Sequence, residues 1–393
     1  MRFGEEILDI ISRFEKAGHE AYVVGGSLRD RLLGRDAFDV DMTVSALPEE
    51  TVSLFHDMRV IPTGIKHGTV TVLTPSGAPV EITTFRTDGS YSDSRHPDKV
   101  TFTRSLPEDL ARRDFTVNAM AYSPEKGTVD LFDGKKDLEN KIIRCVGEPK
   151  KRFSEDALRI LRAFRFSAQL DFSIESETYE AAVALGEKIT ALARERVAVE
   201  FMKLLSAPRV AHVLDAMEPI LGYVLPDTPI KSERFSLCDR LYPDPVARLA
   251  LLVYGGDAGA VAQSLRFSTA DKQRLKTLST PREMPHTEAD ARRMLAVHSN
   301  TEDCIACVKI ASLIKGEDLE KTERMIASVS EKAPCLSVSE LAVNGKDLMD
   351  IGVEKGKQLG IVLHRLLDAV IEKPELNQKS ALLTLAGEIM GDL

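Results

Sequence analysis

The hydrophobic pattern of this chain changes its period near residue 145, and that change limits the folds open to it. Up to this point, short apolar runs typical of strands alternate with a few helical stretches: AYVVGG, DVDMTV, HGTVTVL, PVEITTF and KVTFT. After residue 146, apolar residues recur at helical spacing, as in SEDALRILRAFRFSAQL and GKQLGIVLHRLLDAVIEK. We therefore predict an α+β protein with an α/β unit first and an almost wholly helical remainder.

With 393 residues, the chain is too long for one hydrophobic core, and we expect several domains. Proline-rich or serine-rich breaks interrupt the helical part at SAPR, LPDTPIKSER and STPREMPHTE. Together with the change of period, these breaks predict four domains, over residues 1–145, 146–208, 209–300 and 301–393.

Composition excludes several classes of protein. No apolar stretch is long enough to span a bilayer, and the amino end lacks the basic and apolar regions of a signal peptide. The five cysteines are odd in number and scattered, which argues against a disulfide framework. Cys304 and Cys307 form a CxxC without a second ligand pair, so a buried helical face is favoured over metal or redox chemistry. We predict a cytoplasmic protein without a membrane partner.

The net charge of −9 is unevenly distributed. Between Lys141 and Arg165 there are eight Lys or Arg and three acids, a local excess of +5. This basic segment is either a stripe that faces phosphates or the solvated face of a helix.

Asp39 and Asp41 are two carboxylates one residue apart on an apolar strand. Side chains alternate along a strand, so these two point the same way and repel each other unless a cation lies between them. Hard oxygen ligands suit Mg²⁺, and a third carboxylate is found at Glu81, on another apolar strand. The pattern predicts catalytic carboxylates at all three positions, with Mg²⁺ held by Asp39 and Asp41. The alternative is a solvated face of an edge strand.

A double glycine between a strand and a helix precedes the aspartates. The amides around Gly25, Gly26 and Ser27 can point at an anion, and Arg29 lies one turn further on. A triphosphate fits there, although a plain turn is the usual meaning of two glycines. GxGxxG and GxxxxGK[ST] are both lacking, so neither a dinucleotide-binding fold nor a P-loop is supported.

A helix predicted to begin near Ser154 carries Asp156 and Arg159 on its polar side, as i and i+3 neighbours. An ordinary intrahelical ion pair is one interpretation. The other is base recognition, since cytosine and adenine both present an amine donor beside a ring-nitrogen acceptor. A carboxylate and an arginine can pair with either base, whereas uracil and guanine would leave buried groups unpaired.

These segments together resemble a known family. The double glycine with Asp39-x-Asp41 is similar to the catalytic signature of the DNA polymerase beta nucleotidyltransferase superfamily. Further stretches resemble the class II tRNA nucleotidyltransferases, the CCA-adding enzymes: GGSLRDRLLG, RRDFTVNAMAY, DLFDGKKDLENKIIRCVG, EDALRILRAFRF and NGKDLMDIGVEKGKQLGIVLHRLLDAV. The resemblance implies a catalytic head, a helical neck with the base-reading helix, a helical body and a tRNA-binding tail for the four predicted domains.

The resemblance also implies roles for single residues. Asp156 and Arg159 would act as an amino-acid template for the base, and Arg162 and Arg165 would lie near the nucleotide. From spacing alone, a packing or tRNA-phosphate role for these two arginines is an equal alternative.

In RRDFTVNAM, Arg113 would bind the nucleotide, while Asp114 and Asn118 would sense the ribose. A salt-bridged helix start is the alternative there. A loop carrying Asp93 and Arg95 disfavours an enzyme that adds only C.

In the tail, Lys355 and Lys357 stand with glycines at a predicted helix start, where they would hold an RNA phosphate or form a solvated face.

The function predicted on these grounds is template-independent addition of C, C and A to the 3′ end of tRNA. CTP and ATP are the substrates and pyrophosphate is released. An A-adding enzyme or a poly(A) polymerase would share these motifs. A non-catalytic tRNA-binding protein is the alternative of another class, against which the paired aspartates count.

Overall fold

The computed structural model describes residues 3–36, 39–88, 100–297, 301–317, 320–332 and 334–391. The chain forms two compact units. The first comprises Met1–Thr228 with Ser264–Arg266, and the second comprises Pro229–Gln263 with Phe267–Leu393. The predicted α+β class is confirmed, because strands are concentrated in the first unit. The division into four domains stays a prediction.

A seven-stranded sheet organises the first unit, in the order β3-β4-β5-β2-β1-β8-β9. Its strands are β1 (Ala21–Val24), β2 (Val40–Val44), β3 (Arg59–Gly64), β4 (Thr69–Leu73), β5 (Pro79–Thr84), β8 (Met120–Ser123) and β9 (Gly127–Asp130). Within this sheet, as far as the structure describes it, β2 and β5 are the neighbouring strands that run parallel, whereas the other neighbours are antiparallel. Two smaller pairs are β6 (Arg86–Asp88) with β7 (Val100–Phe102) and β10 (Ile142–Ile143) with β11 (Ser173–Ile174).

Register places the predicted carboxylates at the centre of this sheet. Asp41 on β2 is the partner of Glu81 on β5, and on its other side it pairs with Val24, the last residue of β1. Paired residues of neighbouring strands project from the same face, so Asp41 and Glu81 lie side by side. The chain continues from Val24 directly into Gly25, the first residue of α2.

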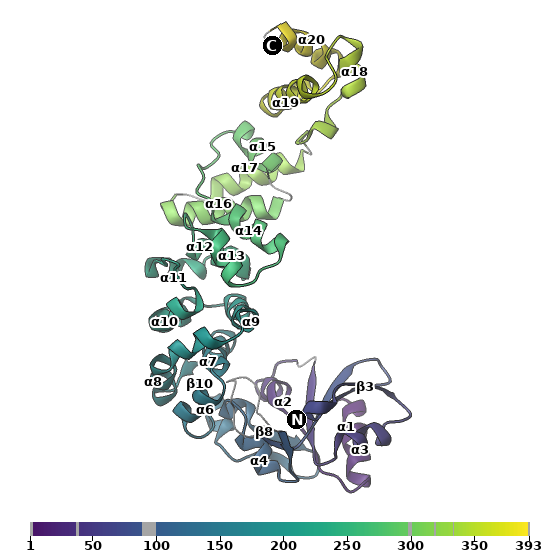
Figure 1. Cartoon of the computed structure of the whole chain (residues 1–393), viewed down its shortest axis with the longest axis vertical. Coiled ribbons are helices and arrows are strands. Elements are labelled where there is room, and N and C mark those ends of the chain that lie inside the picture. Colours follow the sequence, from purple (N-terminus) through teal and green to yellow (C-terminus); the bar gives the residue numbers. More distant parts are fainter. Residues whose placement is uncertain are drawn as a thin grey trace. The chain divides into compact units, whose positions relative to one another are not determined.

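Helices pack around the sheet in the early part of the first unit and form most of its later part. They are α1 (Glu5–Lys16), α2 (Gly25–Leu32), α3 (Pro48–Leu54), α4 (Leu106–Ala111), α5 (Gly134–Glu139), α6 (Pro149–Glu155), α7 (Leu158–Leu170), α8 (Ser176–Ala184), α9 (Arg194–Leu205) and α10 (Ala211–Val224). Short 3₁₀ helices cover Ile65–His67, Thr116–Asn118 and Gly186–Ala191. Figure 1 shows the strands among the early segments and mostly helices from α6 to α10, a stretch in which the two-residue β11 is the strand.

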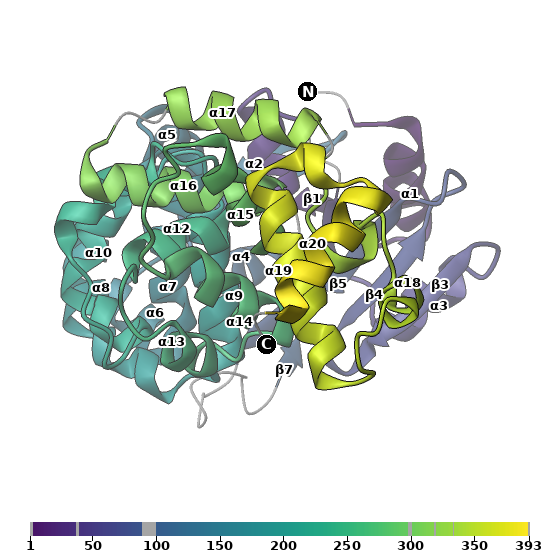
Figure 2. The ribbon, with the colours of Figure 1, turned by 90° about the horizontal axis from the view of Figure 1, so that it is seen from above.

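The second unit is helical throughout its described part. It contains α11 (Phe235–Cys238), α12 (Pro245–Leu252), α13 (Ala258–Ser264), whose last residue belongs to the first unit, α14 (Thr269–Ser279), α15 (Glu288–Val297), α16 (Thr301–Lys315), α17 (Glu320–Glu331), α18 (Gly345–Asp350), α19 (Lys357–Glu372) and α20 (Lys379–Gly391). Short 3₁₀ helices cover Ser232–Arg234, Val338–Glu340 and Pro374–Leu376. The helices α19 and α20 lie side by side, as Figure 2 shows, over a core that includes Leu366 and Leu382. Among the described residues, no helix is long and apolar enough to cross a bilayer.

The CxxC lies on a buried face of α16, as predicted. Cys304 and Cys307 are both buried, and burial raises the pKa of Cys304 to about 12 and that of Cys307 to about 11. Since the thiolate is the reactive and metal-binding form, these two thiols are chemically inert at neutral pH.

This burial predicts a specific pattern of thiol labelling. Cys335 is the most accessible of the five free cysteines, because the other four are buried. We expect a thiol-specific disulfide reagent at pH 8 to modify Cys335 rapidly in the native protein and the rest only after denaturant is added. Cys335→Ser should remove the fast phase. Rapid labelling of Cys304 or Cys307 in the native protein would contradict the assignment of the CxxC to the core.

Candidate active site

The three carboxylates meet where β2 and β5 run parallel. Asp41 is half-buried, Glu81 is its exposed neighbour, and Asp39 lies in the bend just before β2. Burial raises the pKa of Asp41, the charges of Glu81 and Asp39 raise it further, and Arg113 opposes them. Like charges held together in this way gain from a shared cation.

The donor set fits a hard divalent ion, since every candidate ligand is a carboxylate oxygen. The described residues contain no group of three or more His, Cys, Asp or Glu side chains already gathered as a metal site. Asp41 and Glu81 are neighbours across the β2–β5 pair, and Asp39 does not complete a group of three with them.

The glycine turn closes tightly over Asp41. Gly25 has a φ of 69°, in the left-handed region that favours glycine. A Cβ atom at this position would also lie 3.3 Å from the Asp41 Oδ2 atom. Ser27, predicted as an anion ligand, donates its hydroxyl hydrogen to the Val24 carbonyl and accepts from the Asp41 amide. Its hydroxyl therefore holds the turn to the strand that carries Asp41.

A cavity of about 700 Å³ opens beside this turn. A volume of this size is typical of a small-molecule site. Most of the predicted site residues line it: Gly25, Gly26, Arg29, Asp41, Arg113, Asp114, Asn118, Asp156, Arg159 and Arg162. Its further lining includes Val24, Met42, His67, Thr69, Thr83, Arg86, Arg112, Leu158, Phe166 and Arg196. The predicted residues Asp39, Glu81, Ser27 and Arg165 are absent from the lining.

A polar network crosses one wall of the cavity. The Arg29 Nη1 atom donates to the Asn118 side-chain oxygen at 2.8 Å, and the Asn118 amide donates to Asp114 at 3.3 Å. Arg162 completes the chain by donating to Asp114 over 2.7 Å. These four predicted residues come from α2, the 113–118 segment and α7. The structure joins them into one connected group.

Asp114 is held ionised within this network. Burial alone would raise its pKa, but the charge and hydrogen bond of Arg162 outweigh that effect and lower the pKa of Asp114 to about 2. Burial likewise opposes the positive charge of Arg162, and Asp114 overcomes it, so that the pKa of Arg162 is raised.

This shift predicts a pH-dependent contribution to stability. A carboxyl whose pKa falls from 3.8 to about 2 on folding stabilises the native state by about 2 kcal/mol. The contribution is complete above pH 3.8 and is lost as the pH falls toward 2. We expect Asp114→Asn to lower the free energy of unfolding by this amount at pH 7, measured by urea denaturation, and by about half as much near pH 3. Asp171→Asn, at an exposed position after α7, is the control. A loss independent of pH would contradict this account.

Asp109 is a positioning residue that sequence reasoning missed. It is fully buried in α4, and its carboxylate accepts hydrogen bonds from Arg112 at 3.0 Å and Arg113 at 3.2 Å. The same carboxylate accepts from the Thr43 hydroxyl and from the backbone of Arg86. It stands beside Glu108 in the first turn of α4, where acidic residues are common, so no signal in the sequence would have found it. Arg113 is thereby fixed beside Asp41.

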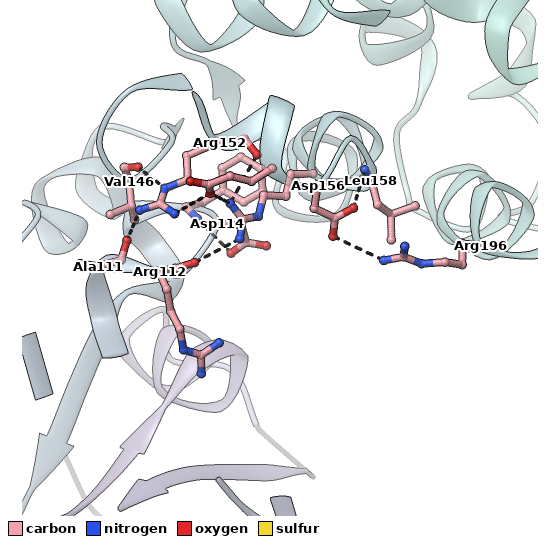
Figure 3. Close-up of polar contacts among 11 residues, drawn as sticks. Ala111, Arg112, Asp114, Val146, Arg152, Asp156, Leu158 and Arg196 are labelled. Atoms are coloured by element: carbon pink, nitrogen blue, oxygen red, sulfur yellow. Dashed lines mark hydrogen bonds and ion pairs between the residues drawn. The ribbon is translucent and has the colours of Figure 1, made fainter. Parts of the chain in front are cut away.

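The prediction of a helix beginning near Ser154 is wrong. The helix α6 runs through Ser154 and ends at Glu155, Asp156 is extended with φ −139° and ψ 105°, and α7 begins at Leu158. The Asp156 carboxylate accepts the Leu158 amide hydrogen at 3.0 Å, so it caps the amino end of α7. Its other oxygen faces Arg196 of α9 at 3.4 Å (Figure 3). Hydrogen bonding to a local amide therefore outcompeted helix continuation.

Arg159 is buried rather than on a solvated polar face. Its Nη1 atom donates to Glu155 at 2.9 Å, and its Nη2 atom donates to the Arg112 carbonyl at 3.2 Å. The intrahelical ion pair with Asp156 is thus excluded, because the two side chains have different partners. Both nevertheless line the same cavity.

Arg165 takes a different place from its neighbours on α7. It forms an ion pair with buried Glu200 at 3.1 Å, and its guanidinium lies 4.2 Å from the centre of the Phe166 ring. Arg29 and Arg162 lie over the same ring at 5.3 and 5.2 Å. Three arginines thus lie against the Phe166 ring, and two of them, Arg29 and Arg162, line the cavity.

Three family models match successive regions of the chain. The chain matches family models described as Poly A polymerase head domain over residues 21–144, Probable RNA and SrmB- binding site of polymerase A over 171–228, and tRNA nucleotidyltransferase domain 2 over 249–386. A CCA-adding enzyme of Leuconostoc mesenteroides is 38% identical, over 99% of this chain and 98% of its own length. The chain belongs to the CCA-adding enzymes. One from Levilactobacillus brevis is also 38% identical, over 95% of each chain.

A solved structure of a CCA-adding enzyme agrees in fold. The Bacillus stearothermophilus CCA-adding enzyme, in complex with CTP, aligns with a TM-score of 0.84 and 31% identity. The alignment covers 99% of this chain and 98% of that one. Family membership makes the protein a nucleotidyltransferase, of a superfamily that generally uses divalent metal.

Several cavity residues escaped the sequence analysis. Arg112 stands next to Arg113 in the motif itself, so the doubled arginine was a usable signal. Phe166 follows Arg165 within α7, where an aromatic residue is expected to belong to the core. Arg196 gave no signal, because it reaches Asp156 from a helix forty residues away in sequence.

The functional roles predicted for two further segments remain untested. Asp93 and Arg95 lie outside the described residues. The helix start predicted around Lys355 and Lys357 is confirmed, since α19 begins at Lys357 after Gly356, whose φ is 115°. The role of these lysines in RNA binding stays a prediction.

Proposed function

We propose that this enzyme adds C, C and A in turn to the 3′ end of tRNA, taking CMP from CTP and AMP from ATP without a nucleic-acid template. One observation carries the proposal: a single cavity is lined both by Asp41 and by Asp156 with Arg159. Bond formation and base selection can therefore act on one bound nucleotide. The CTP complex of the Bacillus stearothermophilus relative supports this reading.

The reaction joins the acceptor to the α-phosphate. The 3′-hydroxyl oxygen forms a bond to the α-phosphorus, the bond to the β-phosphate breaks, and pyrophosphate leaves as the hydroxyl proton is lost. Asp39 and Asp41, with Glu81 beside them, would hold Mg²⁺, which supplies charge stabilisation and a more acidic hydroxyl. The amides of Gly25 and Gly26 with Arg29 and Arg113 bind and orient the triphosphate.

Base selection falls to the residues between α6 and α7. The carboxylate of Asp156 accepts from the amine of cytosine or adenine, and a guanidinium hydrogen of Arg159 is donated to the neighbouring ring nitrogen. The contacts of Arg159 to Glu155 and Arg112 use only part of its five N–H donors, so others remain for the base. Asp114 and Asn118, with Arg162, take the ribose side of the nucleotide.

The remaining helices are proposed to hold tRNA. We assign a catalytic head to residues 1–145, a neck to 146–208, a body to 209–300 and a tail to 301–393. Shape and backbone charge would guide this binding, with Lys355 and Lys357 at the start of α19 among the phosphate contacts. A cytoplasmic location follows from the tRNA substrate.

Nucleotide incorporation tests the proposal directly. Each labelled triphosphate is supplied with Mg²⁺ to tRNA transcripts that end before CCA, after C, after CC and after CCA. We expect two C and then one A, with addition stopping there. Addition of A to the CC-ended transcript alone would mean an A-adding enzyme, and repeated A addition a poly(A) polymerase. Intact tRNA binding without any incorporation would leave a binding protein.

A further inference from the structure

A row of polar side chains leads away from the carboxylates along one face of the sheet. Thr83 lies two residues beyond Glu81 on β5, and it pairs with Thr69 on the neighbouring strand β4. Both threonines are half-buried and line the cavity, while the alternating residues Val70 and Ile82 are buried in the core. The row therefore belongs to the solvent-facing side of the sheet, next to the reacting centre.

The two hydroxyls face each other. Thr69 Oγ1 and Thr83 Oγ1 are 3.0 Å apart, so one donates to the other. This leaves one hydroxyl hydrogen and several lone pairs directed to other partners. A group that both donates and accepts hydrogen bonds matches the pair, and a ribose 2′-hydroxyl is such a group. Arg86 lines this end of the cavity, and its charge suits a nucleotide.

The order of the strands separates this pair from the glycine turn. The strand β1, which leads into Gly25, lies on one side of β2, whereas β5 and β4 lie on the other. Nucleotidyl transfer needs the attacking and leaving oxygens roughly in line on opposite sides of phosphorus. With the triphosphate tail at the glycine turn, the attacking 3′-hydroxyl must approach from the side of the threonines.

The geometry points to a subsite for the 3′-terminal nucleotide of the acceptor RNA, in which the Thr69–Thr83 hydroxyl pair binds its ribose 2′-hydroxyl. This inference rests on the proposed function and adds to it a determinant that distinguishes RNA from DNA ends. Thr69 and Thr83 act as positioning residues, since they orient the sugar whose neighbouring 3′-oxygen reacts near Asp41.

The test compares Thr83→Val with the wild-type enzyme on two acceptors. Both are tRNA transcripts ending in CC, with either a ribose or a 2′-deoxyribose in the last nucleotide, and ATP is the donor. Valine keeps the shape and strand preference of threonine and removes only the hydroxyl. We expect Thr83→Val to raise the KM for the ribose acceptor about fivefold to tenfold, the effect of one lost hydrogen bond, with the KM for ATP unchanged. Thr69→Val should act similarly.

The deoxy acceptor decides whether the contact is the one inferred. For the wild-type enzyme, the KM for the deoxy acceptor should exceed that for the ribose acceptor by about the same factor. Thr83→Val should not raise the KM for the deoxy acceptor further, because the contact is already absent. Thr128→Val, on β9 at the opposite edge of the sheet, is the matched control. The inference would be overturned if Thr83→Val raised the KM for ATP. It would also be overturned if the substitution and the deoxy acceptor together raised the acceptor KM by the product of their separate factors. Absence of A addition by the wild-type enzyme would instead refute the proposed function.

Discussion

Asp41→Asn is expected to reduce the rate of nucleotide addition by about a thousandfold or more while leaving tRNA binding unchanged. Asp41 is the half-buried carboxylate whose pKa is raised by burial and by the charges of Glu81 and Asp39. Asparagine retains the shape but removes the charge that a divalent ion requires. Several kcal/mol of transition-state stabilisation depend on such an ion, and each 1.36 kcal/mol corresponds to a factor of ten in rate.

Two measurements separate chemistry from binding. Single-turnover incorporation of labelled CMP gives the rate of the chemical step, and an electrophoretic mobility shift gives the tRNA affinity. Asp9→Asn, an exposed carboxylate on α1, serves as the control and should match the wild type in both. A rate within tenfold of wild type for Asp41→Asn would remove the paired carboxylates from the mechanism. A parallel loss of tRNA affinity would assign Asp41 a structural role.

The strands around the site were predictable because their residues carry a local signal. Alternation along residues 39–44 and 79–85 identified β2 and β5, and a charge on each apolar strand marked Asp41 and Glu81 as functional. The pairing between them was not predictable. It depends on the parallel register of two strands between which residues 45–78 intervene, and nothing local to either strand fixes a register with the other.

The base-reading segment shows where local reasoning failed. Ser154 followed by two acids favoured a helix that begins there, whereas α6 ends at Glu155 and α7 begins at Leu158. The Asp156 carboxylate resolves this by capping α7, a choice that also turns it toward the cavity. Arg196 and Glu155 then hold the two predicted template residues apart, through contacts that depend on the packing of α6, α7 and α9. Tertiary packing of this kind has no counterpart in a single stretch of sequence.

Asp156→Asn is expected to weaken the choice among the four nucleotides. The amide can still accept the Leu158 hydrogen, so the amino end of α7 remains capped. Because that oxygen is used by the cap, the nitrogen faces the base, where it donates to the carbonyl oxygen that uracil and guanine present. Removing one of the two mismatches with these bases recovers 1 to 3 kcal/mol, about fivefold to a hundredfold in discrimination. Addition of C and A should fall by about tenfold or more, because their amine then meets a donor in place of the carboxylate and loses its hydrogen bond.

The quantity to measure is the ratio of kcat/KM values for two nucleotides with the same enzyme preparation, because differences in the amount of active protein cancel in this ratio. It is measured for CTP against UTP on a transcript ending before CCA, and for ATP against GTP on one ending after CC. Asp171→Asn, beyond the opposite end of α7, should leave both ratios unchanged. If Asp156→Asn lowered all four values equally, Asp156 would serve the cap of α7 alone, and selection of the base would rest on Arg159 and the shape of the cavity. Relaxed discrimination in both pairs would instead mean that one carboxylate reads cytosine and adenine alike, as their shared donor and acceptor edge requires.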